Sequence, residues 1–373
     1  MEEADDDTSI GDDNGRLSGG AVAMAKTQAI GLDIGAKSLR AAEVSSAGGG
    51  RVELVRYAEE PVPAGAVRDG EVVDQPAVAQ ALKQLWSKGG FGSKEVILGI
   101  GNQRVTVRTM QLPKMPMADI RSSLPFQVED SLPIPVDEAV LDFYPTVELA
   151  GPSGTVYEGL VVAAARETVM SNVNAAEAAG LKPLSVDLSA FALLRVMARG
   201  ELGHGTVALV DIGARITTIV VATDGAPRFV RTLPVGTQGL ADILARAKTV
   251  SQAEAEHQVI TRGLQASSAP ENQISADQYN DTARNLVEGI RNSIGFYASN
   301  NRQAPVSYVV LTGGGSTVPG LGQAIASETR TQTLLGNPLE GVTLGKRING
   351  LEGLKGREAT MAMSMGLGMG VAA

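Results

Sequence analysis

The spacing of apolar residues along the chain predicts alternating helices and strands. Helical spacing marks a segment after Pro76 and a long amphipathic stretch over 284–301. The apolar positions concerned are Val78, Leu82, Leu85 and Trp86 in the first and Leu286, Ile290, Ile294 and Tyr297 in the second. Short apolar runs predict strands, and a helix over 167–179 follows the last of them. These strands span 95–100, 105–110, 139–144 and 160–165. The alternation indicates an α/β protein.

Two further patterns concern the second half of the chain. The polar, proline-interrupted stretch over 265–275 predicts a loop. Met361, Met365 and Met369 lie four residues apart, which we interpret as core packing of a last helix; a binding groove is the alternative.

The composition excludes several classes of protein. The chain has 373 residues, which is room for roughly two domains with cores of their own. It contains no cysteine and two histidines, which excludes disulfide-stapled scaffolds and thiolate metal sites and disfavours a multi-histidine metal centre. The absence of cysteine fits a reducing, cytoplasmic compartment best. The net charge of −9 argues against nucleic-acid binding, and no apolar stretch reaches the about 18 residues of a transmembrane helix, so we expect a soluble protein.

The negative charge is concentrated in residues 1–26. This segment holds seven acidic residues against Arg16 and Lys26. Its low hydrophobicity and Gly/Ser content predict a disordered acidic tail outside the fold, and nothing in it resembles a signal peptide. A regulatory or docking arm is one interpretation. A solvated extension, or a start codon placed upstream of Met24, is the other, and composition favours it.

Two similar segments lie about half a chain apart. After an apolar strand, the first reads Asp33-Ile34-Gly35-Ala36-Lys37-Ser38 and the second reads Asp211-Ile212-Gly213-Ala214-Arg215. Two similar halves are implied. In each copy, glycine at a hairpin turn leaves backbone N–H groups facing outward, where they can bind phosphate, and the aspartate can meet a metal-bound water beside it. One Asp-x-Gly alone would indicate a tight turn, but two copies favour a phosphate site.

A third glycine-rich segment follows a strand near the end of the chain. It reads Thr312-Gly313-Gly314-Gly315-Ser316, and Pro319 lies near the start of a helix. Three glycines allow the backbone to approach a flat ligand closely, and the helix start offers N–H groups; a flexible loop is the alternative. The chain contains neither a Walker loop nor a Rossmann fingerprint.

Together these motifs resemble the phosphate 1, phosphate 2 and adenosine motifs of the actin, Hsp70 and sugar-kinase superfamily. Within it, the segments 112–117 and 132–143 resemble the PilM family of type IV pilus assembly proteins, which is similar to the cell-division protein FtsA. The resemblance runs from about residue 28 to the end. It implies a two-lobed actin-like ATPase fold with duplicated ribonuclease H-like domains and an FtsA-type subdomain 1C, also called SHS2.

The resemblance also divides the chain. It places the main subdomain of the first lobe, 1A, at 27–103 plus 183–205 and subdomain 1C at 104–182. The second lobe, 2A and 2B, spans 206–373, and its last helix returns to 1A.

The residue roles that the resemblance implies concern ATP and Mg²⁺. Asp33 and Asp211 would meet Mg²⁺ through water. The nucleotide-binding positions would be Gly35, Ala36, Lys37, Ser38, Gly213, Ala214, Thr217, Glu254, Gly313, Gly314, Gly315 and Ser316. Asp187 aligns with a residue that positions the attacking water in hydrolytic relatives, although an N-cap is an equal alternative. Lys37 and Arg215 stand where relatives carry small residues, and they could either pair with phosphates as cations or crowd the turns. His257 stands in place of a lysine, and we interpret it as a surface residue.

The implied function is that of a nucleotide-gated scaffold. Because no evident general base or acceptor site is present, we expect ATP to fix the shape of a partner-binding surface, with hydrolysis slow or absent. The partner would be the cytoplasmic N-terminal peptide of PilN, an inner-membrane protein, alongside other pilus platform proteins. The protein would then be cytoplasmic and peripheral to the inner face of the membrane, with no direct membrane insertion.

The resemblance implies that the peptide docks in a groove between the first lobe and 1C, against apolar and proline residues in the part of 1C nearest that groove. These are Met115, Pro116, Met117, Phe126, Ile134 and Pro135. For each of them, a place in the core of 1C is an equal alternative. Two other functions stay open, an FtsA-like filament protein and a sugar or acetate kinase. The sequence does not decide the rate of hydrolysis, the oligomeric state or which pilus or secretion system is served.

Overall fold

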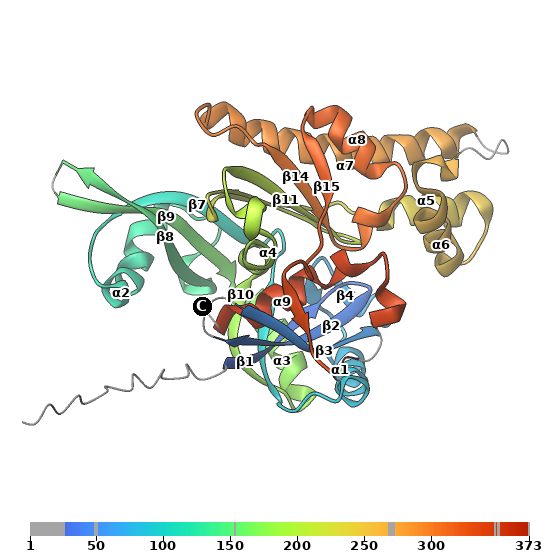
Figure 1. Cartoon of the computed structure of the whole chain (residues 1–373), viewed down its shortest axis with the longest axis horizontal. Coiled ribbons are helices and arrows are strands. Elements are labelled where there is room, and N and C mark those ends of the chain that lie inside the picture. Colours follow the sequence, from blue (N-terminus) through green and yellow to red (C-terminus); the bar gives the residue numbers. More distant parts are fainter. Residues whose placement is uncertain are drawn as a thin grey trace, which may run out of the picture.

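The computed structural model describes residues 27–47, 51–152, 154–267, 273–346, 348 and 351–371. Two β-sheets with their helices form two lobes, and a smaller three-stranded sheet projects to one side (Figure 1). The predicted acidic tail, 1–26, lies outside the described residues. Within them, no helix is long and apolar enough to cross a membrane.

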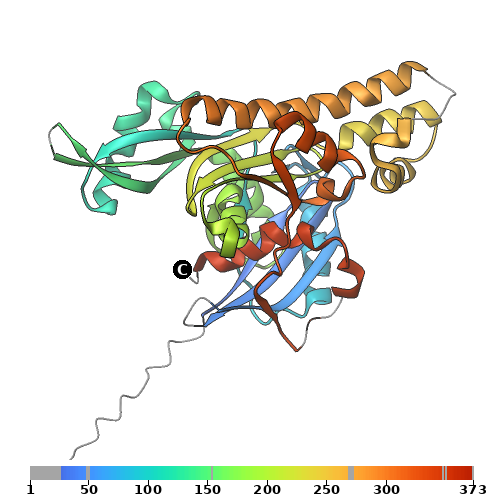
Figure 2. The same cartoon turned by 45° about the horizontal axis from the view of Figure 1, so that its top comes forward.

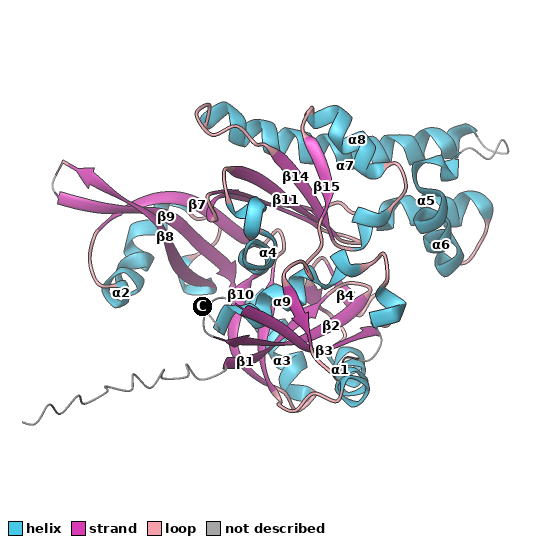
Figure 3. Ribbon diagram, in the orientation of Figure 1, coloured by secondary structure: helices cyan, strands magenta, loops and turns pink. Residues whose placement is uncertain are grey.

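The first lobe is built on a six-stranded sheet in the order β10-β6-β1-β2-β3-β16. Its strands are β1 (Thr27–Ile34), β2 (Ser38–Ala47), β3 (Arg51–Pro61), β6 (Glu95–Ile100), β10 (Lys182–Leu188) and β16 (Val342–Leu344). β1, β2 and β3 form an antiparallel meander, whereas β6 and β10 are added in parallel beside β1. Two helices pack on one face, α1 (Gln75–Gly89) and α3 (Arg166–Ala178), as Figure 3 shows.

The second lobe repeats this plan with five strands in the order β15-β14-β11-β12-β13. They are β11 (Thr206–Ile212), β12 (Thr217–Thr223), β13 (Ala226–Leu233), β14 (Tyr308–Thr312) and β15 (Gln332–Leu335). β11, β12 and β13 form the meander, and β14 and β15 are the parallel additions. The outer face is covered by α5 (Gln238–Lys248), α6 (Gln252–Arg262), α7 (Gln273–Asn300) and α8 (Leu321–Thr329). The two halves predicted from the repeated turns are thus confirmed.

An apolar core shared by both lobes lies between the two sheets. Helices α4 (Ser189–Met197) and α9 (Ala362–Gly368) fill this space, and Figure 2 shows α9 running between the lobes. They pack with Ile97 of the first sheet and with Leu209 of the second. α9 lies directly on β1, since a Cβ at Gly31 would come within 2.1 Å of the carbonyl oxygen of Ser364.

The projecting sheet, which we call the insert (105–165), leaves the first lobe after β6 and returns before α3. It has the antiparallel order β7-β9-β8, with β7 (Val105–Pro113), β8 (Ala139–Gly151) and β9 (Gly154–Ala165). Helix α2 (Met117–Val128) covers one face. Its buried residues Ile120, Leu124 and Val128 pack against Phe143 and Val161, which gives the insert a small core of its own.

Most elements predicted from apolar spacing are present. The helix after Pro76 is α1, which Asp74 caps by accepting a hydrogen bond from the N–H of Ala77 at 3.0 Å. α7 begins at Gln273, earlier than the predicted 284, because Tyr279 and Ala283 continue its buried face. The last helix is confirmed as core, since the side chains of Met361 and Met365 are fully buried. Part of the predicted loop, 268–272, lies outside the described residues.

One further pair of strands belongs to the first lobe. β4 (Val67–Arg68) and β5 (Glu71–Val72) form a short antiparallel hairpin whose two turn residues are Asp69 and Gly70. Both turn residues have positive φ, at 51° and 80°, as tight two-residue hairpins require.

Candidate functional site

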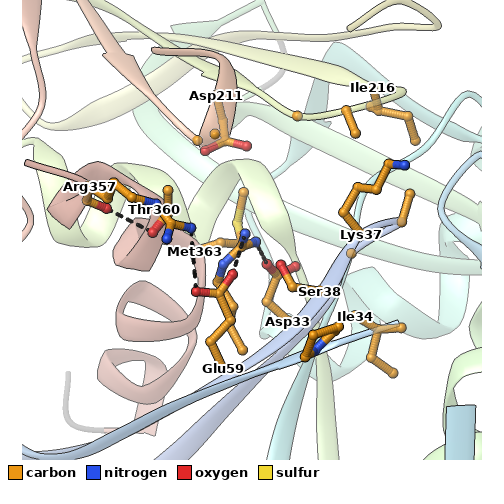
Figure 4. Close-up of a pocket in the computed structure, with 18 of the residues that line it drawn as sticks. Asp33, Ile34, Lys37, Ser38, Glu59, Asp211, Ile216, Arg357, Thr360 and Met363 are labelled. Atoms are coloured by element: carbon orange, nitrogen blue, oxygen red, sulfur yellow. Dashed lines mark hydrogen bonds and ion pairs between the residues drawn. The ribbon is translucent and has the colours of Figure 1, made fainter. Parts of the chain in front are cut away.

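A cavity of about 750 Å³ opens between the two lobes, and residues of all three predicted motifs line it. The first motif contributes Asp33, Gly35, Ala36, Lys37 and Ser38, the second contributes Asp211, Gly213 and Ala214, and the third contributes Gly313 and Gly314. Figure 4 shows Asp33 and Asp211 pointing into this space from opposite lobes. The structure therefore brings together residues that lie far apart in the sequence.

The two Asp-Ile-Gly segments form turns with the same hydrogen bond. In the first turn (35–38) the N–H of Gly35 donates to the carbonyl of Ser38 at 3.1 Å, and in the second turn (213–216) Gly213 donates to Ile216 at 2.9 Å. A side chain on either glycine would meet that same carbonyl oxygen, at 2.9 Å and 2.8 Å. Glycine is thus needed at both positions because the backbone lies too close to this carbonyl oxygen to leave room for a side chain.

The three glycines of the third motif have different structural roles. Gly313 has a positive φ of 76°, and a Cβ there would lie 3.0 Å from Oδ2 of Asp211. Gly315 packs on Ile212, where a Cβ would lie 2.3 Å from Cγ2 of Ile212, whereas Gly314 has open space before it. Gly313 and Gly314 line the cavity, but Gly315 serves the packing of the loop on β11.

A half-buried arginine joins the carboxylates on the first-lobe side of the cavity. Arg40 Nη1 lies 3.6 Å from Oδ2 of Asp33, and its Nη2 lies 3.0 Å from Oε1 of Glu59. Oε2 of Glu59 in turn lies 3.7 Å from Nη2 of Arg357. Arg40 is the cross-strand partner of Asp33 in the β1–β2 hairpin, and Thr218 is the equivalent partner of Asp211. The cation is thus present in one half of the repeat and a hydroxyl in the other.

Burial sets the charge state of these carboxylates. It raises the pKa of Asp33 to about 6, with a contribution from the nearby Asp211 and against the effect of Arg40. Burial also raises the pKa of Asp211, which accepts a hydrogen bond from the hydroxyl of Thr312 at 2.8 Å. Burial, the largest single effect, works in the same direction on Glu59, but Arg40, a hydrogen bond from Ser38 and the charge of Arg357 together outweigh it and lower the pKa of that group. Two carboxyl groups with raised pKa values, Asp33 and Asp211, therefore face the cavity.

Several residues implied by the family resemblance lie away from the lining. Thr217 is fully buried, and its hydroxyl donates to the carbonyl of Val235 at 2.7 Å. Glu254 accepts a hydrogen bond from Gln258 on the outside of α6, whereas Glu256, two residues on and therefore on the other side of the helix, lines the cavity. Ser316 bonds back to the carbonyl of Gly313 at 2.7 Å.

Asp187 also has a different neighbour from the one implied. It lies in β10, and its carboxylate forms a short ion pair with Arg195 of α4. Arg195 further donates to the carbonyl of Gly366 at 2.6 Å, so the pair connects α4 with α9. Ser189, two residues later, lines the cavity instead.

Sequence reasoning missed a group of lining residues from both lobes. They include Arg40, Glu59, Thr218, Thr237, Gln238, Glu256, Arg357 and Thr360. Hairpin register would have found Arg40 and Thr218, because strand residues equidistant from a turn lie opposite each other. The others come from segments that only the fold brings to the cavity.

The apolar residues implied for partner binding belong to the insert. Met115 and Met117 are partly buried against its core, whereas Phe126 on α2 is 83% exposed. Pro116 and Pro135 are exposed, and Ile134 is half-buried.

Comparison with known proteins places this architecture in a family. The family model "Type IV pilus assembly protein PilM" matches residues 31–371. A chain of a PilM–PilN type IV pilus biogenesis complex is 28% identical with a TM-score of 0.78, and the match covers 92% of this chain and 98% of that one. The ethanolamine utilization protein EutJ from Carboxydothermus hydrogenoformans is 15% identical with a TM-score of 0.52, covering 93% and 90%. The fold is the expected actin-like ATPase fold, and the chain belongs to the PilM family of type IV pilus assembly proteins.

Proposed function

We propose that this protein is an actin-like scaffold of the type IV pilus platform that binds ATP between its lobes and a PilN-like membrane protein on its surface. One observation carries the nucleotide part. Two turns with the same hydrogen bond, each two residues after an aspartate, line one cavity of about 750 Å³ from opposite lobes. Family membership and the similarity to a chain of a PilM–PilN complex support the pilus role and the partner.

Each part of ATP has residues suited to it. The backbone of the two turns would bind the phosphates, with Lys37 and Arg215 at the cavity wall as cations. Glu256 offers a carboxylate acceptor for ribose hydroxyls, and Gly313 with Gly314 presents bare backbone to the base.

The donor set also fits Mg²⁺ held through water. Asp33 and Asp211 are half-buried carboxylates whose pKa values are raised by desolvation, so a cation between them would relieve their desolvation and mutual repulsion. Bound there with the phosphates, Mg²⁺ would supply neutralisation of phosphate charge. Arg40 and Arg357 together already balance Asp33 and Glu59 and would keep the first-lobe side close to neutral.

Slow or absent hydrolysis is the second part of the proposal. Among the described lining residues, each carboxylate already has a partner, namely Arg40 for Asp33 and Glu59, Thr312 for Asp211 and Lys37 for Glu256. Asp187 is paired with Arg195 outside the lining. A base ready to take a proton from water is therefore not evident.

Calorimetric titration of the purified chain with Mg²⁺-ATP tests the site. We expect Asp211→Ala to weaken binding at least about tenfold, which is about 1.4 kcal/mol. Asp142→Ala, which removes an exposed carboxylate on the insert, is the matched control and should bind normally. A wild-type chain that binds no ATP would refute the site. Phosphate release at kinase-like rates, lost in Asp211→Ala, would refute slow turnover.

The partner would be the cytoplasmic N-terminal peptide of a PilN-like protein. Holding it would keep this protein at the inner face of the membrane. The proposed contact surface consists of the insert residues Met115, Pro116, Met117, Phe126, Ile134 and Pro135. Phe126 supports it most directly, because a phenylalanine ring 83% exposed to water gains from burial by an apolar peptide.

Fluorescence anisotropy with a labelled peptide of this kind tests the surface. Phe126→Asp should reduce affinity strongly without affecting the fold. Met115→Asp should do so as well, and its thermal melting must be recorded because Met115 also touches the core of the insert. Exposed Gln127, the next residue on α2, provides a control as Gln127→Asp. Unchanged affinity in both apolar variants would remove this surface.

A further inference from the structure

The β4–β5 hairpin lies where the cavity, the second lobe and the insert meet. Its turn residue Gly70 lines the cavity. A Cβ on Gly70 would lie 3.2 Å from Cδ1 of Ile216, the last residue of the second turn, and 2.9 Å from Cβ of Asn102. The hairpin therefore touches the second lobe's phosphate turn on one side and the chain leading to the insert on the other.

The next residue, Glu71, holds both connections of the insert to the first lobe. Its Oε1 accepts hydrogen bonds from Asn102 Nδ2 at 3.2 Å and from Arg104 Nη1 at 3.2 Å, on the segment that enters the insert. The same oxygen accepts a short hydrogen bond from the hydroxyl of Thr168, on the segment that leaves it. Asn102 is 2% exposed and Thr168 is fully buried, so water competes poorly for these bonds.

The two connections are also joined to each other. The N–H of Ala165 donates to the carbonyl of Arg104 at 3.1 Å, and Arg104 Nη2 donates to Glu167 at 2.9 Å. The side chain of Asn102 accepts from the N–H of Arg104 at 2.9 Å. A displacement of Glu71 therefore acts on the whole base of the insert.

We propose that Glu71 transmits the occupancy of the cavity to the insert, and so sets how strongly ATP changes the affinity for the partner peptide. This rests on the proposed function. A ligand bound at the second turn would displace Ile216, and Ile216 in turn would press on the backbone of Gly70. Glu71 would move with Gly70, because the tight turn leaves the backbone of Glu71 little conformational freedom. Glu71 is thus a positioning residue that contacts neither ligand.

The coupling is measured as the ratio of the dissociation constants of the peptide in the absence and in the presence of bound nucleotide. The labelled peptide is titrated onto the full chain with and without a saturating non-hydrolysable ATP analogue. We expect the wild-type ratio to differ from one by roughly fivefold or more, and ATP affinity to change by the same factor when the peptide is present, because linkage is reciprocal. In Glu71→Ala the ratio should fall to within about twofold of one, with ATP affinity in the absence of peptide unchanged.

Two further variants separate transmission from stability. Glu71→Gln keeps an oxygen for Asn102 and Thr168 while losing the charge facing Arg104, and we expect it to retain most of the coupling. Glu167→Ala removes the other carboxylate of Arg104 but leaves the hairpin contacts, and it should couple as wild type. Thermal melting checks that all variants are folded.

The outcomes distinguish the inference from the function beneath it. A wild-type ratio of one, or a wild-type ratio retained in Glu71→Ala, overturns the role of Glu71 while ATP and peptide binding stand. A wild-type chain that binds no ATP overturns the proposed function, and the inference fails with it. If Glu71→Ala does not fold, loss of the coupling in Glu167→Ala, which leaves the hairpin contacts in place, overturns the inference.

Discussion

Replacing Asp33 with asparagine removes a carboxylate whose burial works against the folded state. The pKa of Asp33 is raised from 3.8 to about 6, mainly by burial. Because the folded protein binds this proton more tightly than the unfolded chain, the free energy of unfolding should fall as the pH rises from 3.8 to about 6. One pKa unit corresponds to about 1.4 kcal/mol, so the ionised group destabilises the fold by about 3 kcal/mol above that interval.

The expected gain in Asp33→Asn is smaller than this figure. The variant loses the ion pair in which Arg40 Nη1 lies 3.6 Å from Oδ2 of Asp33. Arg40 retains its other ion pair, in which Nη2 lies 3.0 Å from Oε1 of Glu59. We therefore expect the variant to be more stable than wild type by about 1–2 kcal/mol at pH 7.5 and by much less at pH 4.5. It should also lose most of its stabilisation by Mg²⁺-ATP, which for a wild-type chain at a hundred times Kd is about 2.7 kcal/mol.

Urea unfolding at pH 4.5, 6 and 7.5, followed by circular dichroism, measures both quantities. Asp142→Asn is the control for a carboxylate of ordinary exposure, since its side chain is 59% exposed. A variant no more stable than wild type at pH 7.5, or a difference from wild type that does not change with pH, would refute the reasoning about burial.

Two other substitutions test the packing and the cavity. Gly31→Ala should reduce the free energy of unfolding by roughly 3 kcal/mol or more, and so lower the melting temperature severely, because the new Cβ would lie 2.1 Å from the backbone of α9. The control is Gly92→Ala, whose Cβ would have nothing within 4 Å, and it should leave the melting temperature unchanged. Glu256→Ala should weaken ATP binding about tenfold in calorimetry through the loss of a hydrogen-bond acceptor, whereas Glu254→Ala should not. Equal effects of the two glutamate variants would contradict the assignment of Glu256 to the ligand side.

The sequence allowed the fold to be predicted because the duplication left a local signal in each half. Asp33 and Asp211 each lie near the end of a strand before a Gly-Ala turn, which indicated two similar halves, and the resemblance of these motifs to a known superfamily then implied the fold. The shared core was harder to foresee, since the segments of α4 and α9 that fill it lie more than 150 residues apart and meet only in three dimensions. The subdomain boundaries assigned from the family resemblance stay a prediction.

The site was predictable only where backbone turns make it. The glycines of the three motifs report local geometry, so the place of most of them in the cavity could be anticipated, whereas Gly315 packs on Ile212 instead. Side chains such as Glu59 and Arg357 contribute through pairings across distant elements, which no spacing in the sequence encodes. Glu254 and Glu256 illustrate the limit, because two residues along a helix separate the face that lines the cavity from the outer face.

The placement of α4 and α9 between the sheets has a consequence for how the molecule comes apart. Both helices are buried against residues of either lobe, so neither lobe can lose its structure without exposing apolar surface of the other. The lobes are therefore expected to melt as a single cooperative unit despite their internal repetition. The insert, with a separate small core, is the segment most able to open on its own. Limited proteolysis should accordingly reach the insert before it divides the body at the midpoint of the repeat.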